Sequence, residues 1–258
     1  MPSHQDTIVD QFSRQAVPFS TAPPIRDERA LQLIVDAAGT GPDDTVLDVA
    51  CGPGIVACAF ARVARQVTGI DLTPAMLERA TALAAEKGIA NVSFQLGDVL
   101  PLPFADNAFS IVVSRFAFHH FQEPAAVLAE MRRVCRAGGR VVVADLTASP
   151  DPEKAAAFHR MEILRDPSHA RALTLDELRA LYRGAGFADP SETFWRMDVD
   201  VEGVLSRSFP VPGSEPVIRS LFEESVENDS MGLATRYEAG RLWFSYSNVV
   251  LSAVKTAS

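Results

Sequence analysis

Three aspartates stand where short apolar runs end: Asp48, Asp71 and Asp98. Carboxylate oxygens accept hydrogen bonds from the amino and hydroxyl groups of small ligands. Asp71 suits the two hydroxyls of a ribose, and Asp98 suits an adenine amino group while the Val99 N–H contacts the ring. Aspartate is also common in helix caps and turns, where it needs no ligand. An acid at each of three successive strand ends nevertheless favours a nucleoside-binding site.

A glycine loop follows the first of these aspartates. Gly52, Gly54 and Ala57 fit the pattern Gly-x-Gly-x-x-Ala, and Asp71 comes about twenty residues later, as in dinucleotide-binding folds. Glycines there let the backbone approach a ligand closely. Asp48, just before the loop, would repel a pyrophosphate but attract the ammonium of a methionine moiety. Its charge therefore favours S-adenosylmethionine over a nicotinamide dinucleotide.

Elements that would position these residues can be recognised between residues 45 and 146, where short apolar runs alternate with stretches of helical periodicity. This alternation predicts an α/β fold, a Rossmann-like doubly wound sheet that is mostly parallel. Such sheets bind ligands at the carboxyl ends of their strands, where the three aspartates would meet. The predicted strands are Thr45–Ala50, Val67–Asp71, Val92–Gln95, Phe109–Ser114 and Arg140–Leu146, and the predicted helices are Ile55–Ala64, Pro74–Lys87 and Pro124–Cys135.

The pattern changes after Thr147, where helical stretches dominate and a late antiparallel hairpin strand is expected to complete the sheet. We therefore expect one continuous domain in three parts: an N-terminal helical cover (1–44), a cofactor-binding core (45–147), and a substrate cover with the last strands of the sheet (148–258). The predicted late helices are Glu153–Arg165, Leu175–Ala185 and Val217–Val226, and the late strands are Glu192–Val199 and Leu242–Lys255.

Five motifs carry a family resemblance: Leu47–Gly54, Gly69–Met76, Gly97–Phe104, Phe109–Ser114 and Val134–Arg140. They are similar to those of the class I S-adenosylmethionine-dependent methyltransferases (methyltransferase type 11 domain), in the branch that resembles the C-methyltransferases of ubiquinone and menaquinone biosynthesis. The resemblance implies the Rossmann-like doubly wound fold and S-adenosyl-L-methionine as the cofactor. It also implies contacts to the methionine part from Asp48, Ala50, Gly52 and Gly54, to the ribose from Asp71, and to the adenine from Leu72, Met76, Asp98 and Val99.

Two flanking segments extend the resemblance. Phe12–Phe19 is similar to an N-terminal segment that closes over the cofactor and often ends in tyrosine. At that last position Phe19 would still supply an aromatic wall to the cofactor site, but without the tyrosine hydroxyl. The segment Leu164–Arg171 is similar to one in uncharacterised relatives that covers the substrate. By this resemblance Arg165, His169 and the nearby His159 could reach the substrate, although surface residues of these types need no such role.

The segment Ser114–Phe121 follows the predicted fourth strand, so its side chains should face the transferable methyl group. We expect Ser114 at the cofactor and Arg115 and Phe118 at the substrate. The quinone enzymes often have Gly-Leu-Arg-Asn near this position. The departure from that motif does not support a quinone acceptor.

The pair His119-His120 in this segment is the candidate for catalysis, because a histidine near its ordinary pKa of about 6.5 accepts a proton at neutral pH. We expect His120 to serve the acceptor as a general base or orienting partner, with His119 packed under the sheet or sharing the role. Adjacent histidines without a third ligand at suitable spacing do not indicate a metal site.

Composition narrows the partners. The formal net charge of −9, without clustered Lys and Arg, argues against nucleic acid and favours a neutral or cationic small molecule. The three cysteines stand at unrelated spacings and form no pattern of disulfide pairs. We therefore expect them to be small core residues of a protein in a reducing compartment. We find no signal peptide or apolar run long enough for a membrane span, and expect a cytoplasmic protein. The sequence leaves a homodimer open.

These observations predict transfer of a methyl group from S-adenosylmethionine to a carbon, oxygen or nitrogen atom of a small-molecule acceptor. Two other enzymes remain as alternatives: one that binds S-adenosylmethionine but catalyses a non-methylating step on a natural product, and a nicotinamide-dependent oxidoreductase. A non-catalytic ligand sensor on the same fold is a further alternative, because fold does not determine function.

Overall fold

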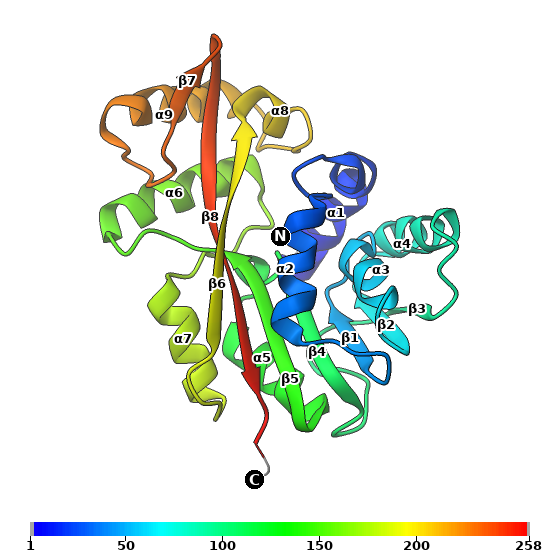
Figure 1. Ribbon diagram of the computed structural model, residues 1–258. Coiled ribbons are helices and arrows are strands. Elements are labelled where there is room, and N and C mark those ends of the chain that lie inside the picture. Colours follow the sequence, from blue (N-terminus) through cyan, green and yellow to red (C-terminus); the bar gives the residue numbers. More distant parts are fainter. Residues whose placement is uncertain (1–2, 257–258) are drawn as a thin grey trace.

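A computed structural model describes residues 3–256 and is built around one eight-stranded sheet with the path β3-β2-β1-β4-β5-β8-β6, to which β7 is added by pairing with β8 (Figure 1). The strands β1 to β5 are mutually parallel, whereas β8 runs antiparallel to both β5 and β6. This confirms the predicted mostly parallel Rossmann-like sheet with a late antiparallel strand. The strands are β1 (Thr45–Val49), β2 (Gln66–Asp71), β3 (Val92–Leu96), β4 (Phe109–Arg115), β5 (Cys135–Leu146), β6 (Ser191–Asp200), β7 (Arg236–Glu238) and β8 (Arg241–Val254).

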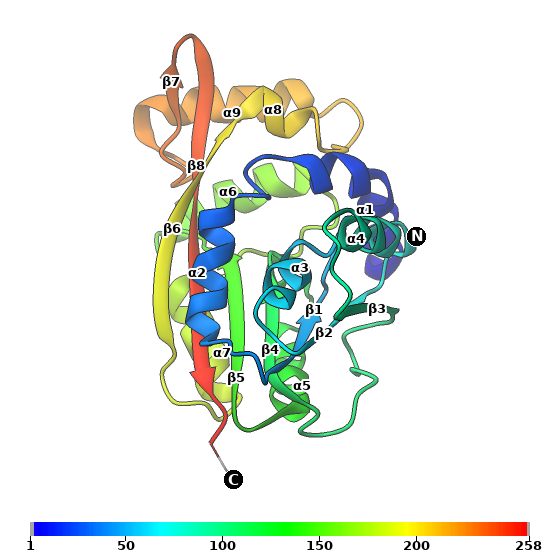
Figure 2. The same cartoon turned by 45° about the vertical axis from the view of Figure 1, so that its right-hand side comes forward.

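Alternation along the central strands explains why both faces of the sheet are covered. In β5, Val141 and Val143 belong to the core beneath one set of helices, whereas Val142 and Ala144 belong to the core beneath the other set. Helices α2 (Glu28–Ala38), α3 (Ile55–Ala61) and α4 (Pro74–Glu86) cover one face, and α5 (Pro124–Val134) and α7 (Leu175–Gly184) cover the other (Figure 2).

A second lobe rises from one end of the sheet. The first half of β8, residues 241–247, pairs only with β6 and β7, beyond the end of β5. Helices α6 (Pro152–Arg165), α8 (Val201–Leu205) and α9 (Glu215–Asn228) pack around this extension (Figure 1). Phe158, Phe222 and Phe244 are buried there in a hydrophobic cluster separate from the two sheet-face clusters. The short elements α8 and β7 were not expected from the sequence.

Helix α1 (His4–Thr21) covers the carboxyl ends of the parallel strands. Ser3 caps it, because its side chain accepts from the Asp6 N–H and its own N–H donates to the Asp6 carboxylate, a capping box. The helix packs against α4, where Arg79 Nε donates to Ser20 Oγ at 3.3 Å. The two N-terminal helices thus separate in role: α1 is a cover, whereas α2 packs on the sheet. No helix within residues 3–256 combines the length and apolarity that a membrane crossing requires.

Candidate active site

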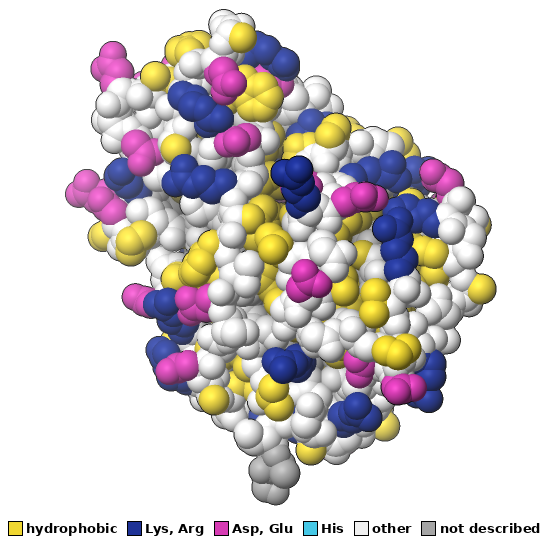
Figure 3. Space-filling view, in the orientation of Figure 1, with side chains coloured by type: hydrophobic (Ala, Val, Ile, Leu, Met, Phe, Trp, Pro, Cys, Tyr) yellow, Lys and Arg dark blue, Asp and Glu magenta, His cyan; other side chains and the backbone are white. Residues whose placement is uncertain are grey.

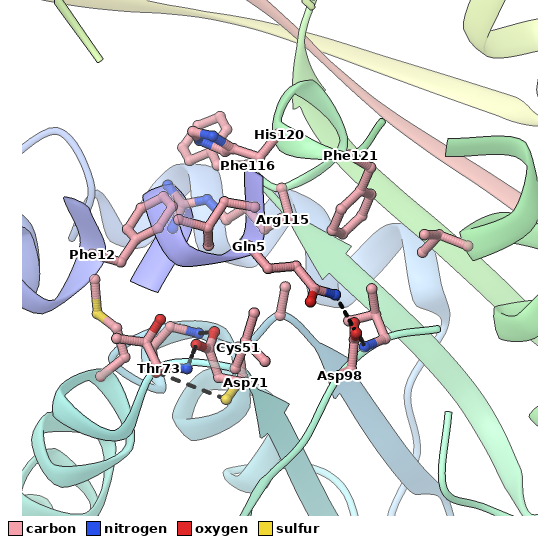
Figure 4. A pocket seen from close by; sticks show the side chains of 18 of the residues that line it. Gln5, Phe12, Cys51, Asp71, Thr73, Asp98, Arg115, Phe116, His120 and Phe121 are labelled. Atoms are coloured by element: carbon pink, nitrogen blue, oxygen red, sulfur yellow. Dashed lines mark hydrogen bonds between the residues drawn. The ribbon is translucent and has the colours of Figure 1, made fainter. Parts of the chain in front are cut away.

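A cavity of about 320 Å³ lies between α1 and the carboxyl ends of β1, β2 and β4 (Figure 4). It is the place at which an open parallel sheet binds its ligand. Ten residues singled out from the sequence line it: Phe19, Ala50, Gly52, Asp71, Leu72, Met76, Asp98, Val99, Arg115 and His120.

The loop after β1 is shaped by left-handed backbone. Ala50 has φ 55°, a left-handed conformation that disfavours a larger side chain and that its small side chain tolerates. Gly52 has φ 51° and no atom within 4 Å of a would-be Cβ, which leaves room for a ligand. At Gly54 a Cβ would come within 2.8 Å of the Ala80 Cβ, so this glycine permits contact between α3 and α4 rather than lining the cavity.

Asp71, at the end of β2, is held rigidly. Its carboxylate accepts from the Gly52 N–H at 2.8 Å and from the Thr73 N–H at 2.9 Å. Burial raises the pKa of Asp71, and these two N–H groups oppose that rise. The carboxylate retains free lone pairs on the cavity wall, in a geometry suited to a vicinal diol.

Asp48 and Arg115 are two buried, incompletely satisfied groups behind the glycine loop. Both Asp48 carboxylate oxygens, and Nε and Nη2 of Arg115, are buried without a hydrogen-bond partner in the described chain. Burial, followed by repulsion from Asp71, raises the pKa of Asp48 to about 8, and burial lowers the pKa of Arg115 to about 10. Buried polar atoms are normally hydrogen-bonded, so these unpaired oxygens and nitrogens fit a ligand that carries both an ammonium and a carboxylate.

Helix α1 reaches the third aspartate. Gln5 Nε2 donates to Asp98 Oδ2 at 2.5 Å, and the Val99 N–H donates to Asp98 Oδ1 at 2.6 Å (Figure 4). His4 Nε2 donates to the His120 carbonyl at 2.8 Å. The cover is therefore fastened to both sides of the cavity by side chains of its first turn.

A smaller cavity of about 100 Å³ adjoins the first. Phe12, Phe19, Ile25, Phe116 and His120 line both cavities and so form the boundary between them. The smaller cavity extends toward the second lobe, where residues of β6, β8, α8 and the end of α6 line it.

His119 lines the smaller cavity and forms a buried dyad with Asp145, at the end of β5. Nδ1 of His119 donates to Asp145 Oδ1 at 2.6 Å, while Oδ2 accepts from the Phe118 N–H at 2.7 Å. Burial disfavours the imidazolium, but attraction by Asp145 and the hydrogen bond to it outweigh burial and raise the pKa of His119 above its ordinary value. The dyad fixes the ring orientation and leaves Nε2 as the acceptor.

His120 is placed differently. Its Nδ1 donates to the Ser168 carbonyl at 2.9 Å, and burial followed by repulsion from His119 lowers the pKa of His120 to about 4. It therefore stays neutral near pH 7.

Several predicted site residues lie outside the lining of both cavities, among them Asp48, which is buried behind the glycine loop. Ser114 donates through Oγ to the Val49 carbonyl at 2.9 Å, and Phe118 is buried in the core under α5. His169 is buried with both ring nitrogens unpaired within the described chain, and the half-buried His159 stacks near it. Arg165 does line the smaller cavity. Sequence reasoning did not include Asp145, although an aspartate ending a fourth strand repeats the pattern of the other three.

The comparisons with known proteins identify the family. The methyltransferase domain family matches residues 47–143. The uncharacterised methyltransferase YcgJ of Bacillus subtilis is 30% identical over 246 residues, which cover 95% of this chain and 97% of YcgJ. The chain belongs to the class I S-adenosylmethionine-dependent methyltransferases. The crystal structure of YcgJ superposes with a TM-score of 0.82 at 27% identity, covering 90% of this chain and all of that one.

Other methyltransferases share parts of the pattern. A demethylmenaquinone methyltransferase of Renibacterium salmoninarum is 37% identical over 116 residues, 45% of this chain and 47% of that protein. Geranyl diphosphate C-methyltransferase from Streptomyces coelicolor, solved with S-adenosyl-L-homocysteine, shares the fold at 20% identity with a TM-score of 0.64, covering 89% of this chain and 78% of its own. The predicted family, enzyme class and cofactor are confirmed: this methyltransferase uses S-adenosylmethionine. Within residues 3–256 no three His, Cys, Asp or Glu side chains are grouped to hold a metal ion.

Proposed function

We propose that the enzyme methylates a protic group of a small molecule bound in the smaller cavity, and that His119 removes the proton. The observation that carries this proposal is the pair of adjoining cavities, one lined by the cofactor motifs and one lined by a His–Asp dyad. When bound, the cofactor supplies an electrophilic methyl group on a sulfonium.

The cofactor contacts follow from unsatisfied groups. Asp48 would pair with the ammonium and Arg115 with the carboxylate of the methionine part, which removes the cost of their buried, unpartnered atoms. Asp71 would accept from the ribose hydroxyls, and Asp98 with the Val99 N–H would bind the adenine edge. Phe19, Leu72 and Met76 would supply apolar contacts.

His119 is preferred to His120 as the general base. The Asp145 carboxylate orients the His119 ring and stabilises the imidazolium that forms when Nε2 accepts the acceptor's proton. His120, with its lowered pKa, is a poorer base and lines the boundary between the cavities, where it could orient the acceptor. Alignment and exclusion of water by α1 would supply much of the remaining acceleration.

A small molecule is favoured over a macromolecule. On the face seen in Figure 3, Lys and Arg side chains are interspersed with Asp and Glu rather than gathered into a basic surface. The smaller cavity has room for a compact group only. A cytoplasmic location is supported by three buried cysteines, none of them in a disulfide.

Incubation of the enzyme with S-adenosylmethionine and fractionated cell extract tests the activity. We expect acceptor-dependent release of S-adenosylhomocysteine and a product heavier by one methylene, identified by mass spectrometry. A product of unchanged mass with the cofactor intact would instead support the non-methylating alternative. Stabilisation by NAD, but not by S-adenosylhomocysteine, in a thermal-shift panel would contradict the cofactor contacts and support an oxidoreductase.

A further inference from the structure

The smaller cavity has a polar lining toward the second lobe, formed by Arg165, Asp166, Arg207 and Tyr246. Apolar side chains form much of its remaining wall, among them Phe116, Met197, Val199 and Val204. An acceptor that fits this space would therefore be largely apolar, with one polar end that meets these groups.

Most of these polar groups are satisfied within the protein. Arg165 forms a buried ion pair with Glu162 at 2.5 Å and donates to Ser208 Oγ at 3.0 Å. The Tyr246 hydroxyl donates to Glu162 at 2.8 Å. The charge of Arg165 is thus already balanced, and the tyrosine has a partner.

The carboxylate of Asp166, which also lies on the cavity wall, has hydrogen-bond partners within the protein. Its Oδ1 accepts from the N–H and the hydroxyl of Ser168, and its Oδ2 accepts from Gln15 Nε2 at 3.2 Å. Neutral donors and the nearby Arg165 therefore stabilise its negative charge without a ligand.

Arg207 differs from its neighbours. Within residues 3–256 its guanidinium makes no hydrogen bond or ion pair, although its backbone N–H donates to the Val204 carbonyl at 3.1 Å. Asp200, the carboxylate that attracts it, is engaged by the Gly203 N–H at 2.8 Å and by Arg241 Nη2 at 2.5 Å. Burial, followed by repulsion from Arg165, lowers the pKa of Arg207, with Asp200 opposing this effect. Arg207 is thus a half-buried guanidinium on the cavity wall whose charge lacks a bonded partner.

We propose that Arg207 binds a carboxylate of the methyl acceptor, so that the substrate class is a small, mainly apolar carboxylic acid. A guanidinium offers two parallel N–H donors to a carboxylate, which suits one arginine in a compact cavity. Arg207 lines only the smaller cavity, whereas His120 lines both, so the carboxylate would lie away from the cofactor. The local charge thus differs from the neutral or cationic substrate that the net charge suggested. The inference rests on the proposed function for the identity of the cavity.

Calorimetric titration of the enzyme saturated with S-adenosylhomocysteine tests this assignment with three matched pairs: butyrate and butyramide, benzoate and benzamide, phenylacetate and phenylacetamide. We expect at least one acid to bind about tenfold or more tightly than its amide, as a charge-assisted pair predicts. Arg207→Gln should reduce this preference to within about twofold, and Arg207→Lys should retain part of it.

Arg219→Gln is the matched control, because Arg219 is an exposed arginine paired with Glu202 outside the cavity. It should leave the acid preference unchanged. Equal affinities within every pair, no measurable binding of any acid, or an undiminished preference in Arg207→Gln would overturn the proposal. Binding of S-adenosylhomocysteine is measured first with the wild-type enzyme and each variant. If the wild-type enzyme does not bind it, the proposed cofactor site is wrong. If all of them bind it and the acid preference is still absent or unchanged, only the assignment of Arg207 is wrong.

Discussion

Aspartates at the ends of four parallel strands have four different surroundings. Asp48 is buried without hydrogen bonds, Asp71 is held by two backbone N–H groups, Asp98 accepts from the cover helix, and Asp145 accepts from a histidine. The topology brings the four residues to one edge, but their neighbours decide which remains a ligand acceptor and which orients another side chain. Chemical roles at this site are therefore a property of the surroundings rather than of residue type.

Asp48 should couple cofactor binding to proton release. With a pKa of about 8 in the free protein it is mainly protonated at pH 7, and pairing with the ammonium favours its ionised form. Titration calorimetry at pH 7, in buffers of different ionisation enthalpy, should detect release of most of one proton per S-adenosylmethionine. Asp48→Asn should abolish the release and weaken binding. A wild-type enthalpy that does not depend on the buffer would contradict the pairing.

His119 should determine the acidic side of the pH profile. A general base works in its neutral form, so kcat/KM should fall as the pH drops through the pKa of His119, which lies above the ordinary 6.5. His119→Gln should lower turnover by roughly 100-fold and remove this inflection, with cofactor affinity retained.

His120→Gln is the matched control for that experiment. Since the pKa of His120 is about 4, its replacement should leave the inflection assigned to His119 in place. If His119→Gln leaves both the turnover and the inflection unchanged, His119 is not the general base.

At the scale of elements, α1 connects parts that are far apart in sequence. Gln5 binds Asp98 after β3, and Gln15 binds Asp166 after α6. Phe12 and Phe19 of the same helix line the walls of both cavities. We therefore expect α1 to open transiently in the free protein and the bound cofactor to hold it closed.

Hydrogen exchange checks this prediction. The amides of residues 8–19 should exchange several-fold more slowly with saturating S-adenosylhomocysteine than without it. The amides of α7, on the opposite face of the sheet, serve as an internal reference and should not change. Protection of the loop 50–54 without any protection of α1 would show that the helix is not part of the cofactor cover.

At the scale of the whole molecule, two hydrophobic cores lie on the faces of the sheet, beneath the proposed cofactor site, and a third core lies in the second lobe, beside the proposed acceptor cavity. Phe222 is fully buried in this third cluster, against Phe244 with ring centroids 4.6 Å apart. The same lobe supplies Arg207 and much of the wall of the smaller cavity. We therefore expect that a substitution in the second lobe can alter acceptor binding without altering cofactor binding.

Phe222→Ala tests this separation. Loss of a buried aromatic ring should reduce the free energy of unfolding by about 3 to 5 kcal/mol, measured by urea denaturation. The affinity for S-adenosylhomocysteine should stay within about twofold, whereas the acid binding assigned to Arg207 should weaken. An equal loss of cofactor affinity would show that the lobes act as one unit.

The sequence by itself determined the sheet, most of its covering helices, the family and the cofactor, and it singled out ten residues that line the larger cavity. This was feasible because burial on both faces requires continuous apolar strands, and because ligand contacts from strand ends and glycine loops are local in sequence. Asp71 and Gly52, nineteen positions apart, lie on neighbouring strand ends in every sheet of this topology and meet here through a hydrogen bond. Helix α3 ends three residues earlier than predicted, whereas β5 begins five residues earlier, at Cys135, which pairs with Phe109 of β4.

Only the tertiary structure decided what surrounds the acceptor. His119 and His120 are adjacent and chemically identical, yet their pKa shifts are opposite. For His119 attraction by Asp145 outweighs burial and raises the pKa, whereas for His120 burial and repulsion from His119 lower it. Arg207 carries no motif, and its missing partner becomes visible only when Asp200 is seen to be occupied by Arg241. Contacts between residues far apart in the chain leave no periodic pattern in it, because they depend on how separate elements pack. The cofactor could therefore be predicted from local motifs, whereas the charge of the acceptor cavity had to come from the folded molecule.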